Sequence, residues 1–221
     1  MAASPLPTIL SPLAIRAIIF DCDGVLVDSV GLAGEVLGEY LRDLGFDVTQ
    51  KEATRRFGSG KMADYVARFE AETGKRLPAT FEQELRGRRE RVFRQRLRAV
   101  AGASELVERL SVPSCVASNG PMAQIEHSLR VVGLLDRFEG RIFSAYTIRA
   151  WKPEPDLFLH AAQALGAPPD ECAVIEDTEL GLQAAVSAGM QAFAYLPLGG
   201  QPQQRGVRTL RHLHELLPHL D

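Results

Sequence analysis

Short runs of apolar residues, each long enough for a buried strand, recur along the chain and alternate with stretches of helical periodicity. The four runs are AIIF before Asp21, SCVAS before Asn119, CAVIE before Asp177 and QAFAYL near the C-terminus. Each later run follows helix-like sequence, and two of those stretches end at Gly166 and Gly189, which are typical helix stops. The alternation predicts an α/β fold, a Rossmann-like doubly wound parallel sheet with helices on both faces.

The segment after the first strand interrupts this alternation, because only helical patterns occur in it. Three helices are expected there, with the sequences GLAGEVLGEYLRDLG, KMADYVARFEAETG and TFEQELRGRRERVFRQRLRAV. Such an insert lies above the carboxyl ends of the strands, where open α/β sheets bind ligands. We therefore expect an N-terminal extension over residues 1–14, a core of residues 15–29 and 100–221, and an all-helical cap domain over residues 30–99.

Polar residues stand where the apolar runs end, and parallel strands bring those ends to one edge of the sheet. Four carboxylates in one cleft would lose their charges through raised pKa values unless cations held them ionised. A lysine supplies one positive charge, and Mg²⁺, which suits carboxylates, water and phosphate oxygens, would supply the rest. The residues are Asp21, Asp23, Ser118, Asn119, Lys152, Glu176 and Asp177.

The first pair of acids suggests phosphoryl chemistry. Residues two apart in an extended segment point to the same side, so Asp21 and Asp23 can face one substrate. One carboxylate can attack phosphorus and form an aspartyl-phosphate, while the other protonates the leaving oxygen and then activates water. Ser118 and Asn119 precede a helix, where a hydroxyl and free backbone N–H groups would face an anion.

Each signal alone also has an ordinary structural interpretation. Paired acids often cap helices, and the KPEP stretch at Lys152 can be a polar turn with prolines. Glu176 and Asp177, followed by Thr178, can be a helix N-cap with acids in the first turn. Their joint occurrence at successive strand ends favours the active-site interpretation.

Charge and cysteine content narrow the classes of function. The net charge of −3 leaves no electrostatic signal for nucleic acid, and the basic stretch from Arg86 to Arg98 is interleaved with glutamates, so we interpret it as a solvated helix face. The cysteines Cys22, Cys115 and Cys172 lie in or beside apolar runs, which favours a reducing cytoplasm. Cys22 is interpreted as a small buried spacer, with a reactive thiol as the alternative.

The first residues of the chain contain three prolines and no long apolar stretch, which is typical of neither a signal peptide nor a membrane span. The expected partner is a small phosphorylated molecule, with no nucleic acid and no membrane. A monomer or weak homodimer is expected.

From about Arg16 to the C-terminus the chain resembles the haloacid dehalogenase-like superfamily, in its branch with a helical cap after the first strand. The stretches DCDGVLVDS, ASNG, WKPEP and IEDTELGLQAAVSAGM are similar to its four motifs. The resemblance implies that Asp21 is the nucleophile, Asp23 the acid and base, and that Lys152 helps to bind the phosphate. It places Ser118 and Asn119 at the transferred phosphate, and Mg²⁺ between Asp21, the backbone carbonyl of Asp23, Glu176 and Asp177.

Individual residues favour one branch of this superfamily. The members that cleave carbon–halogen or carbon–phosphorus bonds lack the second acid, which is Asp23 here. The mutases carry a histidine shortly after the first motif, where this chain has Ala33, although Val25 is shared with the beta-phosphoglucomutases. Hydrolysis is thus expected, with a sugar phosphomutase as the alternative. A binding or regulatory protein would be expected to have lost Asp21, Asp23 or Lys152.

The likeness is closest to bacterial phosphatases of small sugar phosphates, including 6-phosphogluconate. We expect an Mg²⁺-dependent phosphatase that hydrolyses sugar or sugar-acid phosphates through an aspartyl-phosphate. The stretch RRFGSGKMADY resembles the cap loop that reaches into the active site in this family. There Lys61 would meet the far end of the substrate, the alternative being a polar turn with a solvated lysine.

Overall fold

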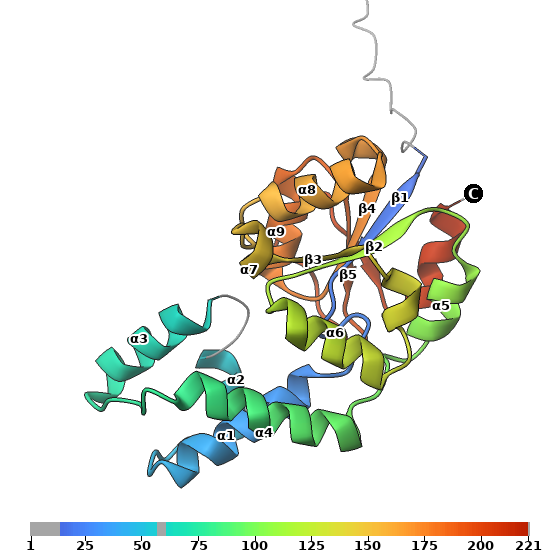
Figure 1. Cartoon of the computed structure of the whole chain (residues 1–221). Helices are drawn as coiled ribbons and strands as arrows, with labels where there is room; N and C mark the ends of the chain where they lie inside the picture. The colour runs from blue at the N-terminus through green and yellow to red at the C-terminus, as the bar shows by residue number, and fades with distance from the viewer. Residues whose placement is uncertain (1–13, 57–60, 221) are drawn as a thin grey trace, which may run out of the picture.

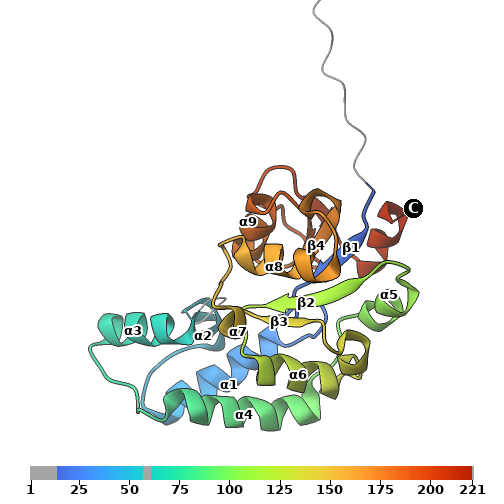
Figure 2. The same cartoon turned by 45° about the horizontal axis from the view of Figure 1, so that its top comes forward.

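A parallel sheet forms the centre of the molecule (Figures 1 and 2). The computed structural model describes residues 14–56 and 61–220, and within them the strand order is β3-β2-β1-β4-β5-β6. All neighbouring strands pair in parallel, as the predicted α/β fold requires. The sequence pattern missed β3 and β6 as strands, because each is only three residues long. The strands are β1 Ala17–Phe20, β2 Ser114–Ser118, β3 Ile142–Ser144, β4 Cys172–Glu176, β5 Gln191–Tyr195 and β6 Arg208–Leu210.

Helices cover both faces of the sheet, so its central strands read as continuous apolar runs. In β1, Ile18 and Phe20 enter one hydrophobic core, whereas Ala17 and Ile19 enter the other. The first core is closed by α5 (Ala103–Arg109), α6 (Met122–Val131), η1 (Leu135–Phe138) and η3 (Leu213–His219), the second by α7 (Ala145–Ile148), α8 (Asp156–Leu165) and α9 (Glu179–Ser187). One further 3-10 turn, η2 (Pro169–Glu171), precedes β4.

Between β1 and α5 the described chain forms helices only, as expected. They are α1 (Val30–Asp43), α2 (Gln50–Arg56), α3 (Met62–Thr73) and α4 (Phe81–Arg96), and α2 was missed because QKEATRR has no apolar period. They bury a third hydrophobic core, in which the rings of Tyr40 and Phe81 stack with centroids 5.2 Å apart. Figure 2 shows these helices grouped beside the sheet. This separate core suits a cap domain, whose exact boundaries stay a prediction.

Two further expectations concern helix ends and cysteines. Gly166 ends α8 with φ 69° and Gly189 follows α9 with φ 74°, which confirms both predicted stops. The three cysteines are buried free thiols. Burial raises the pKa of the Cys22 thiol well above its usual value, which supports the interpretation as a spacer. Within the described ranges no helix has both the length and the apolar character needed to span a membrane.

Candidate active site

The carboxyl ends of the central strands open into a cavity of about 490 Å³ that the helical insert completes. Its wall on the sheet side contains every residue predicted at the strand ends. From the insert, α1, α2 and α4 contribute Ala33, Leu37, Arg55, Arg86 and Arg89, among others. The strand-end residues that line it are Asp21, Asp23, Ser118, Asn119, Lys152, Glu176 and Asp177.

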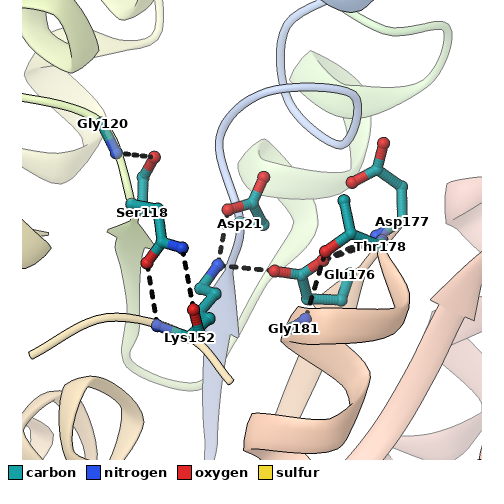
Figure 3. A network of polar contacts seen from close by, with 9 residues as sticks. Asp21, Ser118, Gly120, Lys152, Glu176, Asp177, Thr178 and Gly181 are labelled. Atoms are coloured by element: carbon teal, nitrogen blue, oxygen red, sulfur yellow. Dashed lines mark hydrogen bonds and ion pairs between the residues drawn. The ribbon is translucent and has the colours of Figure 1, made fainter. Parts of the chain in front are cut away.

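Lys152 joins two of the predicted carboxylates (Figure 3). Its side chain is buried, and its Nζ lies 2.6 Å from Asp21 Oδ1 and 2.5 Å from Glu176 Oε1. The Asn119 side chain holds the backbone of Lys152, because its Oδ1 accepts from the Lys152 N–H at 3.0 Å and its Nδ2 donates to the Lys152 carbonyl at 3.3 Å. The lysine is therefore fixed at both its backbone and its ammonium group.

Both carboxylate oxygens of Glu176 accept hydrogen bonds. Besides the lysine on Oε1, its Oε2 accepts from the backbone N–H groups of Asp177 and Thr178 and from the Thr178 hydroxyl, at 2.9 to 3.0 Å. Thr178 Oγ1 in turn accepts from the Gly181 N–H and caps α9. A Cβ at Gly181 would lie 1.9 Å from the Glu176 carboxyl carbon, so only glycine fits there. Thr178 is thus the N-cap of α9, as one interpretation predicted, and the active-site role of Glu176 and Asp177, which line the cavity, stays a prediction.

Asp177 is oriented differently from its neighbour. In Figure 3 its carboxylate points away from Lys152, and its Oδ1 is buried without a hydrogen-bond partner among the described residues. Gly24, with φ 87°, brings the loop after β1 so close that a Cβ would lie 2.1 Å from Asp177 Oδ2. Our sequence reasoning did not use Gly24, although its place directly after Asp23 is a signal for such a close approach.

Asp23 is held by a residue that the sequence reasoning missed. Ser29, almost fully buried, donates its hydroxyl to Asp23 Oδ1 at 2.5 Å. Asp23 itself is half-buried and lines the cavity beside Asp21, as the alternation in an extended segment predicts. On the next strand, Ser118 Oγ accepts from the Gly120 N–H at 3.1 Å. The signal for Ser29 was its place inside the same motif, DCDGVLVDS.

The site carries more negative charge than Lys152 balances. Burial raises the pKa of Asp21 to about 7, with Lys152 opposing and Glu176 and Asp23 adding to the rise. Burial, Glu176 and Asp21 raise the pKa of Asp177 well above its usual value. The pKa of Lys152 is raised, because the two carboxylates outweigh the effect of burial. A further cation beside Asp21 and Asp177 would restore both carboxylates to their ionised form.

These residues suit a hard divalent cation. The unpartnered Asp177 Oδ1 and the excess of carboxylate oxygens are the features that such an ion requires. In the described residues no three His, Cys, Asp or Glu side chains converge on one point as metal ligands do. The predicted ligand set therefore stays a prediction, in which Glu176 already accepts hydrogen bonds from Lys152 and Thr178 and Asp23 would contribute its backbone carbonyl.

The insert differs from its prediction in two places. Lys61, at the start of α3, lies with its Nζ 4.0 Å from the centroid of the Trp151 ring and is not among the described residues that line the cavity. The Gly-Ser-Gly turn before it lies outside the described residues, so the loop assignment stays a prediction. The stretch from Arg86 to Arg98 is not simply a solvated face, because Arg86 and the half-buried Arg89 belong to the cavity wall.

Arg89 had a detectable signal in the sequence. The buried residues Phe81, Leu85 and Phe93 of α4 form an apolar stripe with a spacing of four residues. Arg89 occupies the position in this stripe between Leu85 and Phe93. A charged residue in the apolar stripe of a helix indicates a special partner, because burying an unpaired charge is costly.

Comparison with known proteins agrees with this architecture. The model of the haloacid dehalogenase-like hydrolase family matches residues 15–189, and the chain belongs to this family. It is 33% identical over 205 residues to 6-phosphogluconate phosphatase of Escherichia coli, covering 91% of this chain and 93% of that protein. It is 31% identical to beta-phosphoglucomutase of Bacillus subtilis, covering 90% and 94%.

A solved structure is similar over nearly the whole chain. It is a HAD family hydrolase from Deinococcus radiodurans with bound phosphate and sodium, with a TM-score of 0.72 and 28% identity over 92% of this chain and 93% of that one. The family match and the phosphatase relatives confirm the predicted enzyme class, phosphoric monoester hydrolase.

Proposed function

We propose that this enzyme is an Mg²⁺-dependent phosphatase that hydrolyses small sugar or sugar-acid phosphates, such as 6-phosphogluconate, through an aspartyl-phosphate. One observation carries the proposal: Asp21 lies at the end of β1, 2.6 Å from the buried ammonium of Lys152, in a cavity that Asp23 and Ser118 also line. A carboxylate nucleophile, a second acid and a fixed cation around one cavity are the groups that phosphoryl transfer needs.

Each residue at the strand ends has its own role in the proposed hydrolysis. Asp21 attacks phosphorus, and Asp23, oriented by Ser29, protonates the leaving oxygen and later takes a proton from the attacking water. Lys152 and the backbone N–H groups after Ser118 stabilise the charge on the phosphoryl oxygens. Glu176 accepts a second hydrogen bond from the Lys152 ammonium and helps to fix its position.

The proposed metal ligands are Asp21, Asp177 and the backbone carbonyl of Asp23. When bound, Mg²⁺ would neutralise phosphate and carboxylate charge. Glu176 was also predicted as a ligand, and its four hydrogen-bond donors favour a positioning role instead. Asp177, whose Oδ1 has no partner in the described structure, is the better candidate for direct contact.

A sugar phosphomutase is the second candidate, because one of the relatives reported above is a beta-phosphoglucomutase. Retention of the phosphoryl group requires a residue that excludes or delays water. No histidine is among the described residues that line the cavity, and Ala33 lines it near the first motif. These observations support hydrolysis.

The proposal is tested by measuring phosphate release from a panel of sugar, sugar-acid and nucleotide monophosphates. We expect release to need Mg²⁺, to cease in excess chelator and to proceed without a sugar-bisphosphate primer. Brief incubation with phosphorus-labelled substrate followed by acid quenching should leave label on the unaltered protein and not on Asp21→Asn, and hydroxylamine should release that label as phosphate while leaving a hydroxamate at Asp21. Full activity in chelator contradicts the metal assignment, and isomerisation that depends on the primer favours the mutase.

A further inference from the structure

Of the six arginines of α4, Arg91 and Arg94 are exposed and lie outside the cavity, and the other four fall into two pairs with different surroundings. Arg88 lies 2.5 Å from Asp43 of α1, and Arg96 lies 2.5 Å from Glu35 of the same helix, so both have an acid partner. Arg86 and Arg89 instead line the cavity, and no ion pair joins either of them to an acid in the described structure. Arg88 and Arg96 thus form ion pairs with α1, whereas Arg86 and Arg89 at the cavity have no acid partner among the described residues.

Arg89 is the less exposed of the two arginines and has a buried donor without an acceptor. Its guanidinium carbon lies 5.4 Å from the Phe93 ring centroid, and its Nε is shielded from solvent with no hydrogen-bond acceptor among the described residues. Burial lowers the pKa of Arg89, the charge of Asp23 raises it and the charge of Arg86 lowers it. An arginine remains charged at neutral pH and a buried donor without an acceptor is costly, so an anionic acceptor that reached Arg89 would stabilise it.

The charge on the cap wall of the cavity is predominantly positive. Arg55 of α2 lines the same space, and Glu82 is the one acid that the described part of the insert adds to it. The opposite wall holds the carboxylates and Lys152, where the transferred phosphate belongs under the proposed function. A ligand that spans the cavity therefore meets cations at its far end as well.

We propose that Arg86 and Arg89 bind a second anionic group of the substrate, a carboxylate or a second phosphate at the end away from the transferred phosphoryl group. This inference rests on the proposed function and assigns its substrate class, phosphomonoesters with two anionic ends. It gives the cap arginines the role of selecting the substrate that was predicted for Lys61, which contacts Trp151 in this structure. Arginine suits the task because its planar donors match a carboxylate or a phosphate.

The test compares four compounds in the unaltered enzyme and in Arg89→Met and Arg86→Met. Glucose 6-phosphate and 6-phosphogluconate differ in the carboxylate, fructose 1,6-bisphosphate adds a second phosphate, and p-nitrophenyl phosphate as a reference has no far end to bind. We expect kcat/KM for the two compounds with a second anion to fall about 10- to 100-fold, mainly through KM. Values for glucose 6-phosphate and the aryl phosphate should change less than about threefold.

Two controls separate substrate recognition from structure. Arg94→Gln alters an exposed arginine of the same helix outside the cavity and should leave every substrate unaffected. Arg89→Lys keeps the charge and should recover part of the preference. In an Asp21→Asn background, calorimetry should show that Arg89→Met removes the difference in affinity between 6-phosphogluconate and glucose 6-phosphate.

The outcomes separate a failure of the proposed function from a failure of the inference about the two arginines. If the unaltered enzyme hydrolyses none of the compounds, the proposed function fails and this inference fails with it. If it hydrolyses them and the variants lower kcat/KM equally for all substrates, the arginines do not recognise a second anion. In that case the inference alone is overturned. If only fructose 1,6-bisphosphate is affected, the second anion is a phosphate, and if only 6-phosphogluconate is affected, it is a carboxylate.

Discussion

Asp21→Asn should abolish phosphatase activity and at the same time stabilise the metal-free protein. The pKa of Asp21 is raised from 3.8 to about 7, chiefly by burial. One pKa unit corresponds to about 1.4 kcal/mol, so keeping this group ionised at about pH 8 costs the folded state up to roughly 4 kcal/mol. Asparagine removes that cost and leaves Lys152 paired with Glu176.

The gain should be smaller than this ceiling, because the amide replaces a charged acceptor of the Lys152 ammonium by a neutral one. We expect about 1–3 kcal/mol at pH 8. The sign of the pH dependence follows from the raised pKa. The protonated Asp21 of the unaltered protein contributes stability that is complete below about pH 4 and is lost as the pH rises to about 7. The advantage of the variant should therefore grow with pH and level off above about pH 7.

Urea denaturation in chelator, at several pH values between about 5 and 8, measures this difference. Asp28→Asn is the matched control, since it makes the same chemical change at an exposed residue of the same loop outside the cavity, and its stability should follow that of the unaltered protein. Added Mg²⁺ should raise the melting temperature of the unaltered protein and of Asp28→Asn, with little effect on Asp21→Asn. A variant that is less stable at pH 8 than at pH 5, relative to the unaltered protein, would refute the reasoning.

Three further experiments test other parts of the site. Asp23→Asn should lower kcat by roughly 10²- to 10⁴-fold with the fold intact, which steady-state kinetics and circular dichroism would show, and an unchanged kcat would move proton transfer elsewhere. Asp177→Ala should raise the Mg²⁺ concentration for half-maximal activity more than Glu176→Gln does, and a metal titration showing the opposite order would make Glu176 the direct ligand. Lys152→Met should cost about 3–5 kcal/mol in urea denaturation at neutral pH and less at about pH 5, since two buried carboxylates lose their cation, and equal stability at both pH values contradicts that account.

The fold and the strand-end residues were predictable because both depend on local patterns. Buried parallel strands are apolar on both sides, so their ends are visible as the first polar residues after an apolar run. Parallel pairing then brings those ends together, as it does for Asp21 and Asp177. The short edge strands β3 and β6 and the polar helix α2 were missed because each depends on tertiary contacts more than on its own sequence.

Positions across the cavity were harder to predict, because no local rule relates a helix of the insert to the sheet. Lys61 was assigned to the cavity from a turn pattern, whereas its side chain lies over Trp151, a contact with no signature in either stretch. Ser29 contacts Asp23 through a turn whose course the sequence does not specify.

A single physical rule nevertheless connects the residues that matter at both walls. Asp21 follows AIIF, Glu176 ends the apolar run CAVIE, and Arg89 occupies the apolar stripe of α4, so in each case a charge stands where the pattern calls for an apolar residue. Burying a charge is tolerated only when it is compensated. Asp21 and Glu176 are compensated by Lys152 within the chain. Arg89 has no ion pair with an acid in the described structure, and under the inference above the anion that compensates it is the far end of the substrate.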